Sequence, residues 1–424
     1  MSSPIPEDWS QAPLHEISER IRITVQDDPE HILTISSTSG WVDQRKKWAR
    51  NMAGESLKKY THLYRGEFSY NRGNSKTFPY GCVFKLTGWD NAAVPNIYHS
   101  FRVDAEKVNP DFVLHSFHGG RLDSQLRTII TSSARANGLL NITAGDFFGI
   151  ELALPPLPEQ QKIAQILTSV DEVIEKTQAQ IDKLKDLKTA MMHELLTKGI
   201  GHVEFKDSPV GRIPVGWEVR DFASVVKESN QGVNTTTEKV TYSESGITAI
   251  RSNNVEENRL DMRNKKFVSR EMYNRLTDKV KPRLNDVLYC NIGSKLGAAA
   301  VVTTDDEMLI TWNVLRVSVK ETSLVPKYFS YLLNSNRKGL RGVATESTMP
   351  FISSKVLSKY EFIVPPIGEQ NLIVSILETV DRKCLLADGK LSALKNTKKA
   401  LMQDLLTGKV RVNTEQSTSS LTVG

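Results

Sequence analysis

The sequence predicts an α+β protein built as a pseudo-two-fold internal repeat, in which two strand-rich mixed domains are separated by two long antiparallel coiled-coil helices. Two observations predict the helices: one segment occurs twice, and each copy carries apolar residues at heptad spacing. A third predicts the domains, because the remaining blocks contain short apolar runs broken by Gly, Asn, Asp and Pro. A chain of 424 residues is long enough for two or three domains.

The repeated segment is the most informative feature of the chain. Pro155-Pro156-Leu157-Pro158-Glu159-Gln160 returns as Pro365-Pro366-Ile367-Gly368-Glu369-Gln370, and the match continues without a gap to Thr197 and Thr407. The distance between the copies is far above the roughly 20 to 50 residues of solenoid repeats. The chain is therefore predicted to contain a duplicated domain with its helix.

Each copy opens a long helix. Pro158 and Gly368 stand just before the Glu-Gln pair that begins the helical pattern, and Gly199 and Gly408 stand where each helix should end. Between these limits, steps of four and three residues alternate for more than four heptads, which is typical of a coiled-coil seam. The seam positions are Ile163, Leu167, Val170, Ile174, Thr177, Ile181, Leu184, Lys188, Met191 and Leu195 in the first copy, and Ile373, Leu377, Val380, Cys384, Ala387, Leu391, Leu394, Lys398, Leu401 and Leu405 in the second.

The two helices are predicted to pair with each other, antiparallel, because each has one similar partner in the chain. When every seam position faces a seam position, Lys188 lies level with Asp381 and Lys398 lies level with Asp171. A charged residue at a core seam position can set the register of a coiled coil. We therefore predict two symmetric lysine–aspartate contacts; the alternative is that both lysines reach solvent independently.

The predicted organisation has five parts. A first domain covers residues 1–154, a first helix covers 155–200, a linker with the second domain covers 201–364, a second helix covers 365–410, and a disordered tail covers 411–424.

The composition of the chain limits the kinds of partner, compartment and metal site that can be expected. A net charge of +6 and a pI near 9.0 favour an anionic partner. No apolar run is long enough for a membrane helix and the N-terminus lacks a signal pattern, so a cytoplasmic protein is expected. The three cysteines stand far apart without a clustered histidine, and no metal site is predicted.

The residues carry a resemblance to a known family. The doubled Pro-Pro-Leu/Ile-x-Glu-Gln segment, the helix ends Leu-Leu-Thr-Lys-Gly and Leu-Leu-Thr-Gly-Lys, the linker FKDSPVGRIPVGWEV and the segment YRGEFSYN are similar to the specificity subunit of type I restriction-modification enzymes. The resemblance covers essentially the whole chain, and its signals are specific as a set.

The resemblance implies two target recognition domains that each read one half of a split, asymmetric double-stranded DNA sequence. It also implies that the helices dock two modification (methyltransferase) subunits, through which restriction (endonuclease and translocase) subunits join, in a bacterial or archaeal cytoplasm. This chain itself would bind no cofactor, and the partner subunits would use S-adenosylmethionine, ATP and Mg. With both domains reading one face of the duplex, the half-sites should lie about one turn apart, roughly 34 Å.

Base reading requires polar and basic side chains at groove edges, together with phosphate contacts. Loops that combine Asn, Gly and Ser with basic residues are the candidates for base contacts, whereas lysine runs are candidates for phosphate contacts; a solvated surface run is the alternative for each cluster. The candidate DNA-binding residues are Arg45, Lys46, Lys47, Arg72, Asn74, Lys76, Ser133 and Arg135 in the first domain, and Arg251, Asn253, Asn254, Lys265, Ser294, Lys295 and Ser347 in the second.

No catalytic motif is found: a phosphate-binding loop, HExxH and GxSxG are all missing from the sequence. Asn109-Pro110-Asp111-Phe112 resembles the Asn-Pro-Pro-Phe motif of adenine methyltransferases, but its third position differs. Its parallel with Val325-Pro326-Lys327-Tyr328-Phe329 indicates a duplicated structural element instead. His115 and His118 could indicate a metal or acid–base site, although a structural role is favoured. The competing functional class is a coiled-coil protein–protein scaffold without DNA specificity.

Overall fold

The computed structural model describes residues 5–26, 30–37, 39–45, 54–73, 78–130, 140–345 and 349–414. The chain divides into two compact units. Unit 1 comprises residues 1–179 with 389–424, and unit 2 comprises residues 180–388. Each unit therefore contains one strand-rich domain together with one part of each long helix. No helix among the described residues combines the length and the apolar character required to cross a lipid bilayer.

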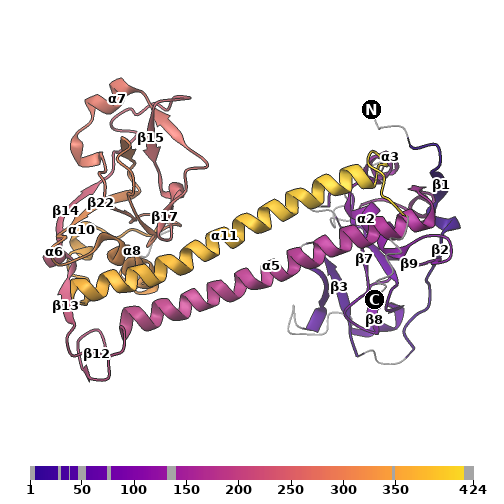
Figure 1. Ribbon diagram of the computed structural model, residues 1–424, viewed down its shortest axis with the longest axis horizontal. Helices are drawn as coiled ribbons and strands as arrows, with labels where there is room; N and C mark the ends of the chain where they lie inside the picture. The colour runs from indigo at the N-terminus through magenta and orange to yellow at the C-terminus, as the bar shows by residue number, and fades with distance from the viewer. Residues whose placement is uncertain are drawn as a thin grey trace, which may run out of the picture. The chain divides into compact units, whose positions relative to one another are not determined.

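The repeated segments form the two long helices, α5 (Leu157–Thr197) and α11 (Ile367–Leu405) (Figure 1). The seam positions are buried or half-buried along both helices, and most residues between them are exposed. Gly199 and Gly408, just beyond the two ends, both adopt a φ of +70°, the left-handed conformation that commonly terminates helices. The predicted helices and their seams are thus confirmed.

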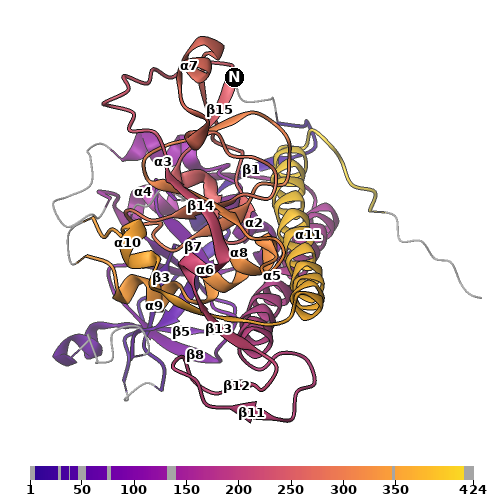
Figure 2. The same ribbon diagram turned by 90° about the vertical axis from the view of Figure 1, so that its left-hand side faces the viewer.

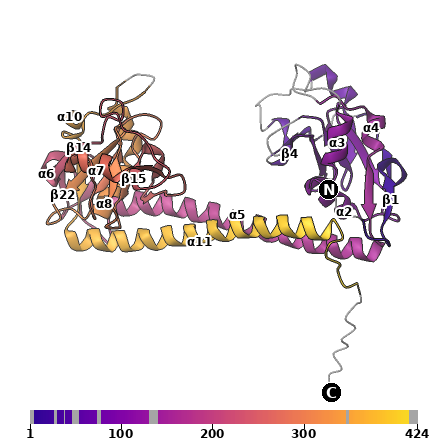
Figure 3. The same ribbon diagram turned by 90° about the horizontal axis from the view of Figure 1, so that it is seen from above.

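Within each unit, the segments of α5 and α11 lie side by side and run in opposite directions (Figures 1 and 3). Both lysine–aspartate contacts that the antiparallel register predicts are present. Lys188 Nζ lies 2.5 Å from Asp381 Oδ1 in unit 2, and Lys398 Nζ lies 2.6 Å from Asp171 Oδ1 in unit 1. The lysine side chains are only 19% exposed, so they do not reach solvent independently.

Unit 1 is built around one four-stranded antiparallel sheet and several smaller strand pairs. The sheet has the order β2 (Ser18–Arg20), β9 (His99–Val103), β6 (Phe68–Asn71) and β7 (Cys82–Lys85). The strand pairs are β1 (Ser10–Pro13) with β10 (Glu151–Leu154), β3 (Leu33–Ser36) with β4 (Gly40–Asp43), and β5 (Thr61–Tyr64) with β8 (Asn91–Val94). The short helices are α2 (Pro110–His118), α3 (Asp123–Ile129) and α4 (Ala144–Phe148).

Unit 2 repeats this plan with additional strands. Its four-stranded antiparallel sheet has the order β14 (Val226–Gln231), β22 (Val314–Val319), β19 (Val287–Cys290) and β20 (Ala299–Val301). A three-stranded sheet has the order β18 (Lys266–Val268), β15 (Ile247–Ile250) and β21 (Met308–Ile310), and the pairs are β13 (Glu218–Asp221) with β23 (Glu361–Val364) and β16 (Val255–Glu256) with β17 (Arg259–Leu260). The short helices are α6 (Phe222–Val225), α7 (Arg270–Arg275), α8 (Pro326–Ser335), α9 (Arg337–Gly342) and α10 (Ser354–Leu357).

The Gly- and Pro-rich stretch predicted to be a linker contains a short hairpin, β11 (Phe205–Lys206) with β12 (Ile213–Pro214) (Figure 2). The stretch is also anchored at both ends. Ile200 N–H and Trp217 Nε1 donate to the two carboxylate oxygens of Glu369, at 3.0 and 2.8 Å. This part of the chain is therefore held against the start of α11.

The glutamine of the repeated Glu-Gln pair performs the same structural task in each unit. The buried Gln160 accepts a hydrogen bond from Asn109 N–H at 2.9 Å, and the buried Gln370 accepts one from Val325 N–H at 2.8 Å. Each amide nitrogen donates to the carbonyl five residues earlier in the chain. The glutamines thus tie the start of each long helix to the start of α2 or α8, which explains why this glutamine is identical in both copies.

Glu159, the glutamate of the first copy, binds the start of the tail that was predicted to be disordered. Glu159 accepts two hydrogen bonds from Arg411, each 2.7 Å long, and Asp8 accepts two more from the same guanidinium. These pairs raise the pKa of Arg411 and hold it in place. Arg411, the first residue of the tail predicted to be disordered, is therefore fixed by hydrogen bonds. Residues 415–424 of that tail lie outside the described residues.

Helices α2 and α8 occupy matching places between their sheet and the helix pair (Figure 3). Both begin with proline, which suits the first turn of a helix. Asn109 accepts hydrogen bonds from Asp111 N–H and Phe112 N–H, so the residues that resemble a methyltransferase motif form a helix cap. The duplicated structural element predicted for Asn109-Pro110-Asp111-Phe112 is confirmed.

The same helices bring one polar side chain each to the lysine–aspartate pairs. In unit 2, Tyr331 Oη donates to Asp381 Oδ2 at 2.6 Å. In unit 1 the matching residue is His115, which is 3% exposed and has Nε2 3.1 Å from Thr168 Oγ1 and Nδ1 4.0 Å from Asp171 Oδ2. The favoured structural role of this histidine therefore agrees with its place in the core.

Unit 1 is expected to lose stability as the pH falls from 6.5 to 4. Burial lowers the pKa of His115 to about 4, so over this range the unfolded chain binds a proton that the folded unit excludes. His115→Gln should flatten the slope of unfolding free energy against pH by up to about 1.4 kcal/mol per pH unit. Urea unfolding followed by pulse proteolysis reports this value for unit 1, with His15→Gln, at an exposed histidine of the same unit, as control. An unchanged slope in His115→Gln would contradict the prediction.

Candidate nucleic-acid interface

The four-stranded sheets of the two units are copies of one structure, which allows their residues to be matched. Tyr70 pairs with His99 in unit 1, and Tyr289 pairs with Leu315 in unit 2, at the same point of the antiparallel ladder. A residue with positive φ, Gly66 or Asn285, lies shortly before the matching strands β6 and β19. Surfaces at corresponding ends of the two sheets can therefore be compared.

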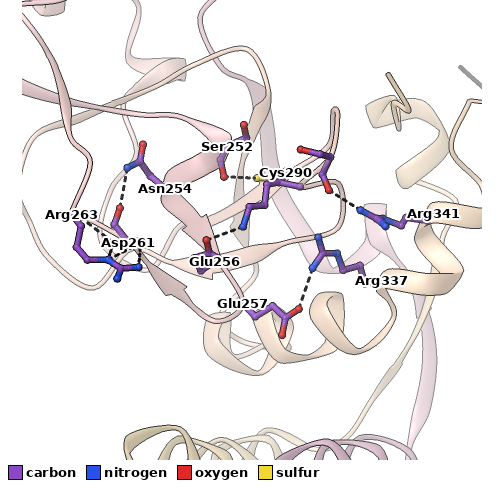
Figure 4. A network of polar contacts seen from close by, with 11 residues as sticks. Ser252, Asn254, Glu256, Glu257, Asp261, Arg263, Cys290, Arg337 and Arg341 are labelled. Carbon is purple, nitrogen blue, oxygen red and sulfur yellow. Dashed lines mark hydrogen bonds and ion pairs between the residues drawn. The ribbon is translucent and has the colours of Figure 1, made fainter. Parts of the chain in front are cut away.

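In unit 2, three sequence clusters predicted to bind DNA come together (Figure 4). Arg251 Nη2 donates to the carbonyl of Asn264 at 2.9 Å, which joins the turn after β15 to the turn before β18. Lys295 Nζ lies 2.8 Å from Glu256 Oε1, which joins the loop after β19 to β16. Residues far apart in the sequence thus form one continuous polar surface.

The loop after β19 is held by two arginines of α9 (Figure 4). Arg337 Nε donates to the carbonyl of Leu296 at 3.0 Å, and Arg341 Nη2 donates to the carbonyl of Ser294 at 2.8 Å. Gly297 adopts a φ of +92°, and a Cβ there would clash with Arg337. These bonds hold the loop that carries the exposed Ser294 side chain. Ser294 lies in a turn, outside the helices and strands.

The predicted contact residues on this surface fall into two groups, those whose side chains are exposed without a bond to a described residue and those that are paired. The side chains of Asn253, Lys265 and Ser294 are exposed, and none of the described residues bonds to them. Lys295 is only one-third exposed and is paired with Glu256, so its charge is already balanced. Groups without an internal partner are the ones that can exchange water for a ligand.

The prediction for Asn254 is wrong. This side chain is 1% exposed, its Nδ2 donates to the carbonyl of Asp261 at 2.9 Å, and its Oδ1 accepts from Arg251 N–H at 3.1 Å. A buried amide must satisfy its own hydrogen-bonding groups, and here it does so by closing a turn. Asn254 therefore supports the neighbouring Asn253 and does not face a ligand.

Acidic residues balance much of the positive charge on this surface. Arg263 forms a bidentate pair with Asp261, and this hydrogen bonding holds the pKa of the Asp261 carboxyl well below its usual range. Arg337 Nη1 lies 3.1 Å from Glu257 Oε1. The surface of unit 2 is thus rich in hydrogen-bonding groups but modest in net charge, a composition suited to reading base edges.

In unit 1, two of the predicted residues are described. Arg45 follows β4 and is exposed, with its N–H donating to Asp43 Oδ1 at 2.8 Å. Arg72 follows β6 and is half-buried; its Nη1 lies 3.4 Å from the carbonyl of Ile142, while its Nε is buried without a partner. The residues Lys46, Lys47, Asn74, Lys76, Ser133 and Arg135, and Ser347 of unit 2, lie outside the described residues.

Two arginines outside the predicted DNA-binding residues lie close to Arg72 in the fold. Arg20 ends β2 and Arg22 follows it, and both are exposed. The pattern Arg20-Ile21-Arg22 alternates as strands do, with the apolar Ile21 packed on the opposite face. This alternation could have indicated that Arg20 and Arg22 share one face of a strand. The two arginines do not belong to a run of basic residues, which was the pattern used to choose candidates.

Comparison with known proteins places the chain in a family. The family model described as the type I restriction modification DNA specificity domain matches residues 98–186 and 214–396. The type I restriction enzyme MjaVIII specificity subunit of Methanocaldococcus jannaschii is 28% identical over 67% of this chain and 68% of its own length. The putative MjaX specificity subunit of the same organism is 25% identical over 97% of this chain and 95% of its own length.

Solved structures share the fold. The type I restriction-modification S subunit from M. genitalium aligns with a TM-score of 0.60 and 12% identity over 96% of this chain and 97% of its own. A chain from a study of complex assembly and conformational transition of the type I R-M system aligns with a TM-score of 0.55 and 15% identity, over 96% of this chain and all of its own. Since the family model matches more than half of the residues, this chain belongs to the type I restriction-modification DNA specificity family.

Proposed function

We propose that this protein reads a split, asymmetric DNA sequence for a type I restriction-modification complex, one half with each unit. The observation that carries the proposal is that two copies of one sheet present different side chains at matched positions. The exposed Arg20 and Arg22 of unit 1 correspond to the half-buried Ser229 and Gln231 of unit 2. Because contacts with DNA depend on side-chain chemistry, two such surfaces suit two different half-sites.

We further propose that the chain is not catalytic and that the long helices dock two modification subunits, through which restriction subunits join. Exposed apolar side chains on the helices support a protein partner: Leu385 and Leu386 of α11 are 59% and 68% exposed, and Leu187 of α5 is 49% exposed. In such a complex, the partner subunits would supply the chemistry that uses S-adenosylmethionine, ATP and Mg.

Exchanging residues 17–154 for the matching block of a relative should change one half of the methylated target and leave the other half unchanged. The physical reason is that each unit has its own hydrophobic core and its own polar surface. The measurement is methylation mapping of host DNA by long-read sequencing, with the partner subunits present. The unexchanged chain, mapped in the same host, is the control.

Two outcomes would count against the proposal. A change in both half-sites would contradict separate reading by the two units. Unmethylated DNA with the original chain, together with DNA affinity that does not respond to salt, would favour the protein–protein scaffold, because phosphate contacts make affinity fall steeply as salt rises.

A further inference from the structure

Four basic side chains of unit 1 fall on one face of the β2–β9–β6 sheet. Arg20 pairs with Phe101, and Ile21 N–H donates to the carbonyl of Ser100 at 2.9 Å, so the antiparallel pairing continues beyond β2. Side chains alternate along a strand, which places Arg22 on the same face as Arg20 and level with His99.

The neighbouring strand completes the group. His99 lies directly opposite Tyr70, with the two rings stacked 6.0 Å apart, and Arg72 follows Tyr70 by two positions. Arg72 Nη1 is 3.4 Å from the carbonyl of Ile142, and the ring of His99 is hydrogen-bonded to the backbone of the same residue. We call Arg20, Arg22, Arg72 and His99 the basic face.

The three arginines of the basic face differ from other arginines of unit 1 in their ion pairing. Across the described residues, no carboxylate forms an ion pair with Arg20, Arg22 or Arg72. By contrast, Arg65 pairs with Asp90 at 2.8 Å, and Arg102, which points away from this face, pairs with Glu67 at 2.5 Å. The arginines of the basic face are therefore available to an external anion.

Among the residues that the structure describes, none bonds to two buried nitrogens of the basic face. Arg72 Nε and His99 Nε2 are both buried and unpartnered, and the His99 side chain is only 7% exposed. Burial, and next the charge of Arg72, lower the pKa of His99 to about 4, so the ring is neutral at physiological pH. Buried polar atoms without partners are rare in folded proteins, and the oxygen of an anion would accept a hydrogen bond from Arg72 Nε.

Unit 2 shows that the fold does not require this charge. The matched residues are Ser229, Gln231, Leu315 and Asn291. Gln231 and Asn291 bond reciprocally through their amides, at 2.8 and 3.1 Å, so the corresponding place is neutral and satisfied. The basic face is therefore a property of one copy and not of the scaffold.

We propose that Arg20, Arg22 and Arg72 of the basic face form a phosphate-binding surface through which unit 1 holds the phosphodiester backbone of duplex DNA, with the neutral His99 packed beneath them. The inference rests on the proposed function for its ligand. It adds an asymmetry: unit 1 contributes more of the salt-dependent affinity, whereas the matched surface of unit 2 contributes neutral hydrogen bonds.

Salt dependence of DNA binding tests the assignment. The full chain is titrated against a fluorescent 40-bp duplex of mixed sequence at several KCl concentrations. The variant Arg20→Ser/Arg22→Gln copies the residues of unit 2 and should lower the slope of log affinity against log salt by about 1.8, which is about 0.9 for each phosphate that the variant no longer neutralises. Arg20→Lys/Arg22→Lys keeps both charges and should retain most of the slope.

A matched control removes two charges elsewhere in unit 1. Arg65 and Lys107 are exposed and paired with Asp90 and Asp104, so Arg65→Gln/Lys107→Gln should leave the slope unchanged. A slope that falls equally in the control and in Arg20→Ser/Arg22→Gln would overturn the basic face as the site. A slope unchanged in both would do the same while leaving the proposed function intact.

Two further outcomes separate the possible ligands. Inorganic phosphate at matched ionic strength should displace the duplex no better than chloride does. If phosphate displaced it specifically from the original chain, the surface would be a free-phosphate site and the DNA assignment would be wrong. If the original chain did not bind the duplex at any salt concentration, both the proposed function and this inference would fail.

Discussion

Replacing Asp286 by alanine is expected to destabilise unit 2 by about 3 to 5 kcal/mol, the largest loss that we predict. Asp286 is 3% exposed and its Oδ2 accepts from Arg316 Nε at 2.6 Å; Arg316 is 4% exposed. The same oxygen also accepts from Arg283 N–H at 2.7 Å. Without this carboxylate, the buried Arg316 would keep, among the described carboxylates, only Glu228, whose Oε2 lies 3.9 Å from Arg316 Nη2, so the loss exceeds that of an ordinary hydrogen bond.

The matched residue in unit 1 provides the control. Glu67 is also buried, but its partner Arg102 has a side chain that is 57% exposed and can be hydrated when the glutamate is removed. Glu67→Ala should therefore cost only about 1 to 2 kcal/mol, mainly because Tyr64 N–H would be left without its acceptor. Pulse proteolysis in urea measures each unit separately. Equal losses in the two variants would refute the argument from burial.

Replacing Glu369 by alanine is expected to destabilise unit 2 by about 2 to 4 kcal/mol. One oxygen of the carboxylate accepts from Trp217 Nε1. The other oxygen accepts from Ile200 N–H and lies 2.8 Å from His202 Nε2. Trp217 is fully buried, so its indole N–H would lose its acceptor without gaining water. Urea unfolding of unit 2, read by pulse proteolysis, gives the magnitude.

The first copy of the motif is the comparison for this prediction. Glu159→Ala should cost less in unit 1, because Arg411 is 44% exposed in its side chain and keeps its pair with Asp8. Glu369→Gln retains one acceptor oxygen and should recover part of the loss. If Glu369→Ala unfolded at the same urea concentration as the original chain, the carboxylate would not anchor the linker.

The long helices and their pairing followed from the sequence because the signals are local and regular. Heptad spacing defines which residues of a helix face a partner, and two similar helices in one chain make each the natural partner of the other. The contacts of Lys188 with Asp381 and of Lys398 with Asp171 then follow from the register alone. No contact with the domains is needed to predict them.

The polar surfaces could be predicted only as candidate segments. Asn253 and Asn254 are adjacent and chemically identical, yet one is exposed and the other is 1% exposed and closes a turn. Which of them faces solvent depends on the backbone carbonyls of Asp261 and Asn264, which come from another turn. Such contacts are not encoded in the spacing of neighbouring residues.

The basic face illustrates the same limit. Arg20, His99 and Arg72 are separated in sequence by dozens of residues, and they share one face because β2, β9 and β6 pair in a particular antiparallel register. Strand register is set by nonlocal packing, and a shift of one residue would turn each side chain to the opposite face. No pattern within one strand could have grouped the three residues.

Local periodicity and duplication were therefore sufficient for the two helices, their antiparallel register and the existence of two related domains. Strand pairing and burial settled which polar residues are structural, which remain available to a ligand, and how the two copies differ in charge. The division has a physical cause: helical order repeats every few residues along the chain, whereas a polar surface is assembled from strands and turns that meet only after folding.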